Sequence, residues 1–195
     1  VGIGFMFAPI FHPAMKYAAA PRREIGIRTV FNILGPLTNP ARAESQVIGV
    51  PSQELGNKIA SVLHRLGTKH SLVVHGTEGM DEISISGKSL IWEVTEHGVL
   101  PPYETSPPDF GFKETSLAEI KGETPEENAS MVRRLLGGEK GPRRDVVVMN
   151  ASAALVAGNQ APDLKEGARI AEEAIDSGRA LEKLDGLVRL SQSLE

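Results

Sequence analysis

The middle of the chain alternates between short apolar runs and one longer amphipathic segment. Residues 45–50 have the length and composition of a strand, and residues 71–75, with Leu72, Val73 and Val74 at their centre, predict a second, buried strand. Between them, residues 55–66 repeat apolar positions at helical spacing and end at Gly67. A strand, a helix and a strand in this order predict a right-handed crossover and a parallel pair, with a ligand site at the carboxyl ends of the strands.

The segment 83–105 follows a different pattern. Residues 83–86 alternate isoleucine with serine, residues 89–95 are again typical of a strand, and His97-Gly98 suits a tight turn. Strands joined by such short connections pair with reversed direction. This stretch therefore predicts an antiparallel meander.

The last third of the chain predicts a series of helices. Thr124, Pro125 and Glu127 supply an N-cap, a proline at the first helical position and a capping-box glutamate. Three further helices are expected near residues 146–157, 164–177 and 181–194. The whole pattern predicts one α/β domain over residues 1–195, with a mixed, largely parallel central sheet and flanking helices.

Residues 1–8 at the start of the chain are apolar without a clear helical or alternating pattern. Residues 1–8 form an apolar run with neither an initiator Met nor a basic segment ahead of it, so it is not a signal peptide. We interpret this run as a buried strand of a larger fold. Residues 12–36 combine small and apolar side chains with arginines and predict two closely packed helices.

Composition narrows the class of protein. Apolar residues make up 41% of the chain and charged residues 24%, with a formal net charge of -4, which is typical of a folded globular protein. The acidic balance disfavours nucleic acid as a partner, and no stretch predicts a membrane span. The lack of cysteine excludes disulfides, thiolate catalysis and zinc held by thiolates. It is typical of a reducing compartment, and we expect a cytoplasmic protein.

Two adjacent carboxylates, Asp81 and Glu82, follow the predicted strand 71–75 after a short loop. They are therefore expected at the carboxyl end of a core strand. Mg²⁺ prefers oxygen ligands and commonly binds one or two carboxylates together with substrate phosphates and water. An isolated Asp-Glu pair is more often a solvated acidic turn, so the two residues alone leave both interpretations open.

Three motifs together resemble one family. They are FAPIFHPAMK at residues 7–16, RREIGIRTVFNILGPLTNP at residues 22–40 and GMDEIS at residues 79–84. Their order and spacing resemble those of the anthranilate phosphoribosyltransferases of tryptophan biosynthesis. The resemblance implies a C-terminal domain like those of nucleoside phosphorylases and related phosphoribosyltransferases, in which residues 12–36 are a helix pair of the family's helical domain.

The resemblance also implies roles for individual residues. Asp81 and Glu82 are expected to bind the Mg²⁺ that accompanies pyrophosphate, and Arg22 is expected to hold the anthranilate carboxylate through its planar guanidinium. Small and apolar residues are expected to line the channel for the aromatic acid, namely Ala8, Pro9, Met15, Gly35 and Pro36. No catalytic acid or base is assigned, because an aniline nitrogen is already unprotonated at neutral pH.

The implied reaction transfers the phosphoribosyl group of phosphoribosyl pyrophosphate to the amine of anthranilate and releases pyrophosphate. The family's glycine-rich pyrophosphate loop and its Lys-His-Gly-Asn motif do not occur in this sequence. We therefore expect that an N-terminal portion is missing and that this chain alone is inactive. The helix pair at 12–36 is then expected to be exposed, rearranged or covered by another chain, which could be the missing N-terminal portion or another copy in a homo-oligomer.

The main alternative is a relative of this fold that has lost catalysis and binds nucleic acid. Basic residues cluster at only three places, Arg22-Arg23, Arg133-Arg134 and Arg143-Arg144. Such a distribution is thin for a surface that follows a phosphate backbone. Another phosphoribosyltransferase or a nucleoside phosphorylase is a further alternative, which ranks lower because the segment 22–40 resembles the anthranilate enzymes more specifically.

Overall fold

The computed structural model describes residues 1–11, 35, 37–39 and 41–194. The chain divides into two compact units, of which the larger comprises Glu44–Leu184. The smaller combines Val1–Ala43 with Asp185–Glu195. Within the described ranges, no helix is both long and apolar enough to cross a bilayer.

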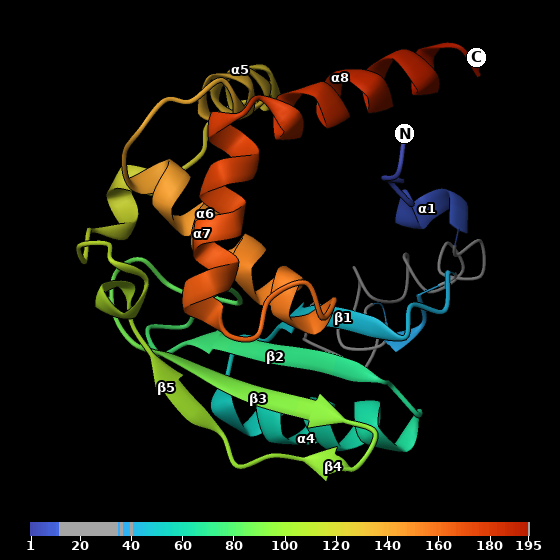
Figure 1. Ribbon diagram of the computed structural model, residues 1–195. Helices are drawn as coiled ribbons and strands as arrows, with labels where there is room; N and C mark the ends of the chain where they lie inside the picture. The colour runs from blue at the N-terminus through green and yellow to red at the C-terminus, as the bar shows by residue number, and fades with distance from the viewer. Residues whose placement is uncertain (12–34, 36, 40, 195) are drawn as a thin grey trace, which may run out of the picture. The chain divides into compact units, whose positions relative to one another are not determined.

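The larger unit is built on a mixed sheet of five strands (Figure 1). These strands are β1 (Ser45–Gly49), β2 (His70–Gly76), β3 (Ser89–Thr95), β4 (Gly98–Val99) and β5 (Tyr103–Thr105). β1 and β2 pair in parallel, with Ile48 opposite Val73. β3 pairs antiparallel with β2, β4 and β5. The predicted mixed sheet is confirmed.

The connections explain which pairs are parallel. The helix α4 (Gln53–Arg65) joins β1 to β2 and provides the crossover that a parallel pair needs. No helix joins β2 to β3, and only Glu96 and His97 separate β3 from β4, so the chain returns in the opposite direction. In the described part of the chain the sheet is therefore mixed but not largely parallel.

Helices cover both faces of this sheet (Figure 1). α4 packs against β2 and β3 on one face, and α6 (Pro142–Ala157) packs against β1 and β2 on the other. α7 (Leu164–Asp176) lies against α6. The remaining elements are η1 (Pro107–Phe110), η2 (Leu117–Ile120), α5 (Pro125–Leu136) and α8 (Arg179–Gln192).

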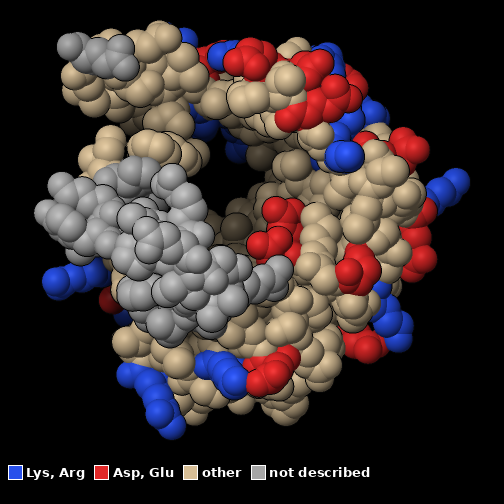
Figure 2. All heavy atoms as spheres, turned by 180° about the vertical axis from the view of Figure 1, so that it is seen from behind, with Lys and Arg blue, Asp and Glu red and all other residues tan. Residues whose placement is uncertain are grey.

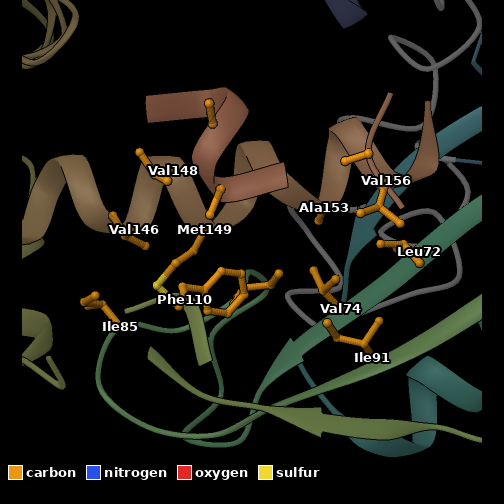
Figure 3. Packing of buried hydrophobic residues seen from close by; sticks show 14 of the residues in the cluster. Leu72, Val74, Ile85, Ile91, Phe110, Val146, Val148, Met149, Ala153 and Val156 are labelled. Carbon is orange, nitrogen blue, oxygen red and sulfur yellow. The ribbon is translucent and has the colours of Figure 1, made fainter. Parts of the chain in front are cut away.

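The main core lies between α6 and the sheet (Figure 3). Leu72 and Val74 of β2 and Ile91 of β3 approach Met149 and Ala153 of α6, and all five are at most 1% exposed. Full burial of a large aliphatic side chain contributes roughly 1.5–3 kcal/mol. This packing fixes α6 over the parallel strands, which becomes important for the site.

The predicted helix starting near residue 124 is confirmed with its cap. The Glu127 amide donates to the Thr124 hydroxyl at 3.3 Å, and the Thr124 amide donates to the Glu127 carboxylate at 3.0 Å. Pro125 begins α5 as expected. The predicted helices near 146–157, 164–177 and 181–194 correspond to α6, α7 and α8.

The strand expected at residues 83–86 is not formed. Ile83 and Ile85 are completely buried, so the alternation does reflect one buried face. The backbone amides of Ile83 and Ser84, however, bond to side chains instead of a neighbouring strand, and the Ile85 carbonyl oxygen accepts from the Thr115 amide in a loop. The Ile83 amide donates to the Asn150 side chain at 2.9 Å, and the Ser84 amide donates to the Ser89 hydroxyl at 2.8 Å.

In the smaller unit, the strand expected at residues 1–8 is also not formed. Residues 1–7 have no regular structure and are exposed, with Phe5 76% exposed and stacked on Phe7. α1 (Ala8–Phe11) is a single helical turn. No strand of the described residues pairs with this run, and an apolar run becomes a strand only when its backbone groups find such partners. The helix pair predicted at 12–36 lies almost entirely outside the described residues.

Candidate functional site

The loop between β2 and β3 brings Asp81 and Glu82 to the carboxyl ends of the two parallel strands. The last residue of β1, Gly49, lies directly beneath Asp81, because a Cβ atom at Gly49 would come 1.6 Å from the Asp81 carbonyl oxygen. At the end of β2, the Gly76 amide donates to the Met80 carbonyl oxygen at 2.8 Å. This is where a ligand site is expected in such a sheet, and where the sequence predicts the acidic pair.

Hydrogen bonds inside the loop give it a defined shape. The hydroxyl groups of Ser84 and Ser86 both donate to the Glu78 carboxylate. Partial burial tends to raise the pKa of Glu78, but these two hydrogen bonds outweigh it and lower the pKa. The Thr77 amide and hydroxyl both donate to the Lys88 carbonyl oxygen, at 2.9 and 3.0 Å, and close the base of the loop. Glu78 therefore stays ionised as an internal anchor.

The two adjacent carboxyl groups of Asp81 and Glu82 affect the ionisation of Glu82. Both residues are exposed at the surface. Partial burial of its carboxyl group raises the pKa of Glu82, although the residue as a whole is exposed, and the charge of neighbouring Asp81 raises this pKa further. A carboxylate whose ionisation is disfavoured by a neighbouring negative charge is stabilised by a bound cation. The pair therefore suits a cation more than an anion.

The donor set of this site fits Mg²⁺ in one specific manner. Among the residues that the structure describes, no group of three or more His, Asp or Glu side chains could enclose a metal ion. Two adjacent carboxylates fit the alternative mode, in which Mg²⁺ keeps waters and takes its other ligands from substrate phosphates. The arrangement thus suits a metal that binds together with a phosphorylated ligand.

Two residues behind the loop were not singled out as site residues by the sequence. His75 at the end of β2 is 6% exposed, and its Nδ1–H donates to the Val50 carbonyl oxygen at 2.9 Å. A carbonyl can only accept, so this bond sets the proton on Nδ1. Asn150 of α6 holds the Ile83 backbone. Residues 150–154 are rich in small side chains, which at helical spacing most often indicate close helix packing.

The packing interpretation is correct for the neighbouring serine. Ser152 is completely buried against α7, where a Cβ atom at Gly167 would come 2.9 Å from its carbonyl oxygen. Asn150 differs because its side chain bonds to the backbone of Ile83, in the loop between β2 and β3. The signal in the sequence is an amide side chain within an otherwise apolar helical run, which requires hydrogen-bond partners when it is half-buried.

The other predicted site residues are only partly described. Arg22, Met15 and Pro36 lie outside the described residues. Ala8 and Pro9 belong to the helical turn α1. Gly35 is described, and its carbonyl oxygen accepts from the Thr38 amide at 3.2 Å. Their roles in binding anthranilate remain predictions.

A separate cavity of about 470 Å³ lies at the amino end of β2. The two ring nitrogens of His70 bond to Asn159 and Glu93, each at 2.9 Å. Burial, followed by the charge of Glu93, raises the pKa of Tyr103 to about 12, so this phenol stays protonated. The central imidazole of this cavity is thus fully engaged with protein groups, and the acidic loop remains the stronger candidate site.

Among the described residues, basic side chains do not gather into one surface. Arg144 is buried and lies 2.9 Å from Asp176, while Arg134 lies 3.0 Å from Glu139. On the described part of the face drawn in Figure 2, blue side chains stand among red ones. This distribution matches the sparse basic clusters seen in the sequence and does not favour binding of a phosphate backbone.

Comparison with known proteins reveals close relatives. The chain is 56% identical over 195 residues to an anthranilate phosphoribosyltransferase of Dehalococcoides mccartyi, and 55% identical over 192 residues to one of Chloroflexus aggregans. It covers 57% and 56% of those proteins, so it spans little more than half the length of these curated relatives. The resemblance inferred from the three motifs is confirmed.

Solved structures agree. The crystal structure of anthranilate phosphoribosyltransferase from Thermus thermophilus superposes with a TM-score of 0.88 at 47% identity, over 95% of this chain and 55% of that one. The Saccharomyces cerevisiae enzyme in complex with phosphoribosyl pyrophosphate and Mg gives 0.84 at 30% identity, over 93% and 52%. A family model described as glycosyl transferase family, a/b domain, matches residues 1–181. The chain therefore belongs to this glycosyl transferase family and carries its α/β domain.

Proposed function

We propose that this chain forms part of an enzyme that transfers the phosphoribosyl group of phosphoribosyl pyrophosphate to anthranilate in tryptophan biosynthesis. In this proposal Asp81 and Glu82 bind Mg²⁺, and Arg22 binds the carboxylate of anthranilate. The observation that carries the proposal is the acidic pair held at the carboxyl ends of β1 and β2 in a chain so similar to these enzymes.

Two complexes of the yeast relative support the choice of ligands. One contains 4-fluoroanthranilate and superposes on this chain with a TM-score of 0.89. The other contains phosphoribosyl pyrophosphate and Mg. The lack of a complete metal cage among the described residues is consistent with a metal that arrives with a pyrophosphate group.

The proposed reaction requires stabilisation of the charge on the leaving pyrophosphate and correct positioning of the attacking amine. The amine nitrogen forms a bond to the anomeric carbon, the bond from that carbon to the pyrophosphate oxygen breaks, and the amine loses a proton. Bound Mg²⁺ supplies neutralisation of the charge on the leaving pyrophosphate. Asp81 and Glu82 would hold this cation at the sheet edge, and Arg22 would orient the aromatic acid for attack.

The metal role can be tested in a chimaera that joins the remaining part of the Dehalococcoides mccartyi relative to this chain. The double substitution Asp81→Asn and Glu82→Gln should lower kcat/KM for phosphoribosyl pyrophosphate by about 100-fold, because metal stabilisation of a leaving group is worth several kcal/mol. Glu114→Gln, at an exposed position outside the loop, is the control. Full activity of the double variant at limiting Mg²⁺ would disprove the metal role.

The anthranilate role of Arg22 is tested against its neighbour. In the same chimaera, Arg22→Ala should raise KM for anthranilate by at least about tenfold, since a charged hydrogen bond contributes about 1.5–3 kcal/mol. Arg23→Ala is the matched control and should leave this KM nearly unchanged. Equal effects of both substitutions would contradict a specific carboxylate contact at Arg22.

A further inference from the structure

The Asn150 side chain makes an unusual pair of hydrogen bonds with one backbone residue. Its Oδ1 accepts from the Ile83 amide at 2.9 Å, and its Nδ2 donates to the Ile83 carbonyl oxygen at 2.9 Å. A neighbouring strand would satisfy a residue's backbone with the same two bonds. The alternating segment 83–86 forms no strand, so Asn150 takes the place of the missing strand partner at Ile83.

The orientation of this amide is fixed by a third bond. Nδ2 also donates to the Val146 carbonyl oxygen at 2.9 Å, one turn earlier in α6. Rotating the amide by half a turn would place Oδ1 against the carbonyl oxygens of Ile83 and Val146, and an oxygen cannot donate to them. The amide therefore has one favourable orientation, and α6 is held in place by Met149 and Ala153 in the core.

The hydrogen bonds between Asn150 and Ile83 lie next to the proposed metal ligands, Asp81 and Glu82. On one side of the loop, the Asp81 backbone rests on Gly49. On the other side, Ile83 is completely buried and bonded at both backbone groups. Glu82 is the single residue between these two fixed points, so its backbone has little freedom. The strands alone do not provide this restraint, because the loop leaves the sheet after Gly76.

From this geometry we infer that Asn150 is a positioning residue, which holds Asp81 and Glu82 in the arrangement needed to bind a divalent cation. The inference rests on the proposed metal site but concerns a residue of a different element, 67 positions after Ile83 in the chain. Residues that orient metal ligands commonly affect metal affinity by about 10–100-fold. In this role Asn150 itself would touch neither metal nor substrate, because its amide bonds to Ile83 and Val146.

The test measures Mn²⁺ binding to the 195-residue chain, from the electron paramagnetic resonance signal of free Mn²⁺, with and without phosphoribosyl pyrophosphate. Asn150→Ala should weaken Mn²⁺ binding by about tenfold or more. Asn150→Asp, which keeps the shape but loses both Nδ2 donors, should also weaken it. Asn57→Ala is the matched control, because Asn57 of α4 accepts from Trp92 Nε1 at 2.8 Å on the opposite face of the sheet.

Amide hydrogen exchange separates positioning from general destabilisation. Exchange at Glu82 and Ile83 should rise in Asn150→Ala but stay unchanged in Asn57→Ala, with both variants compared at equal folded fraction. Unchanged exchange at these amides overturns the inference, as does an equal loss of Mn²⁺ affinity in both variants. If the unsubstituted chain binds no Mn²⁺ under either condition, the metal site of the proposed function fails, and the exchange result alone decides whether Asn150 holds the loop.

Discussion

At the scale of single residues, the candidate site depends on side chains that are small or absent as much as on those that are charged. Gly49 is needed because the Asp81 backbone occupies the space where any side chain would begin. Gly56 of α4, on the opposite face of the sheet, also has no room for a side chain, because a Cβ atom there would come 2.5 Å from the Trp92 ring. Such close approaches let a loop and a helix lie directly on the sheet.

Gly49→Ala should therefore displace the acidic loop. We expect a loss of about 1–3 kcal/mol in the free energy of unfolding, the usual cost of forcing extra volume into a packed site, together with weaker Mn²⁺ binding. Gly87→Ala is the control, because a Cβ atom at this nearby position would meet nothing within 4 Å. Urea unfolding measures the stability of both variants. A stable Gly49→Ala protein would mean that the loop is free to move away from β1.

At the scale of elements, packing between α6 and α7 supports the helix that carries Asn150. Gly167→Ala would bring a Cβ atom within 2.9 Å of the Ser152 carbonyl oxygen. The overpacking cost of about 1–3 kcal/mol exceeds the gain of about 0.8–1 kcal/mol from replacing glycine in a helix. We expect a net loss of stability of about 1 kcal/mol by urea unfolding, whereas Lys165→Ala on the exposed side of α7 should change little. A more stable Gly167→Ala protein would show that α7 can shift.

The capping box of α5 should make the stability of the fold depend on pH through Glu127. Hydrogen bonds from the Thr124 backbone amide and then from its hydroxyl lower the pKa of Glu127. A carboxyl whose pKa is lower in the folded state stabilises the fold above its unfolded pKa, and this contribution is lost as the pH falls through the lowered value. Glu127→Gln should therefore reduce the melting temperature at pH 7 and have a much smaller effect near about pH 3. An equal effect at both pH values would rule out a charge-dependent cap.

At the scale of the whole molecule, the important fact is the share of its relatives that this chain covers, 57% of the Dehalococcoides mccartyi enzyme. We expect no turnover from the 195-residue chain with anthranilate, phosphoribosyl pyrophosphate and Mg²⁺, because the named activity belongs to proteins of nearly twice this length. The chimaera with the remaining part of that relative should be active. Anthranilate fluorescence measures both. Turnover by the chain alone, in material free of longer protein by intact mass, would contradict this expectation.

The sequence by itself determined the elements whose signals are local. The helical period of residues 55–66 predicts α4 and hence the parallel pair of β1 and β2, because such a crossover has one favoured geometry. Thr124 and Glu127 predict the start of α5, because both partners of the capping box lie within one turn. The position of the acidic pair after a core strand could be inferred for the same reason.

Only the tertiary structure decided where nonlocal partners meet. The alternation at residues 83–86 is the same for a strand and for a buried loop, and the difference lies in whether a strand or the Asn150 amide reaches the Ile83 backbone. The approach of Asp81 to Gly49 likewise joins a loop to the end of β1, although a helix and a strand separate the two residues in the chain. Backbone groups accept whichever partner the packing of α6 and the sheet brings to them, and no local pattern encodes that choice.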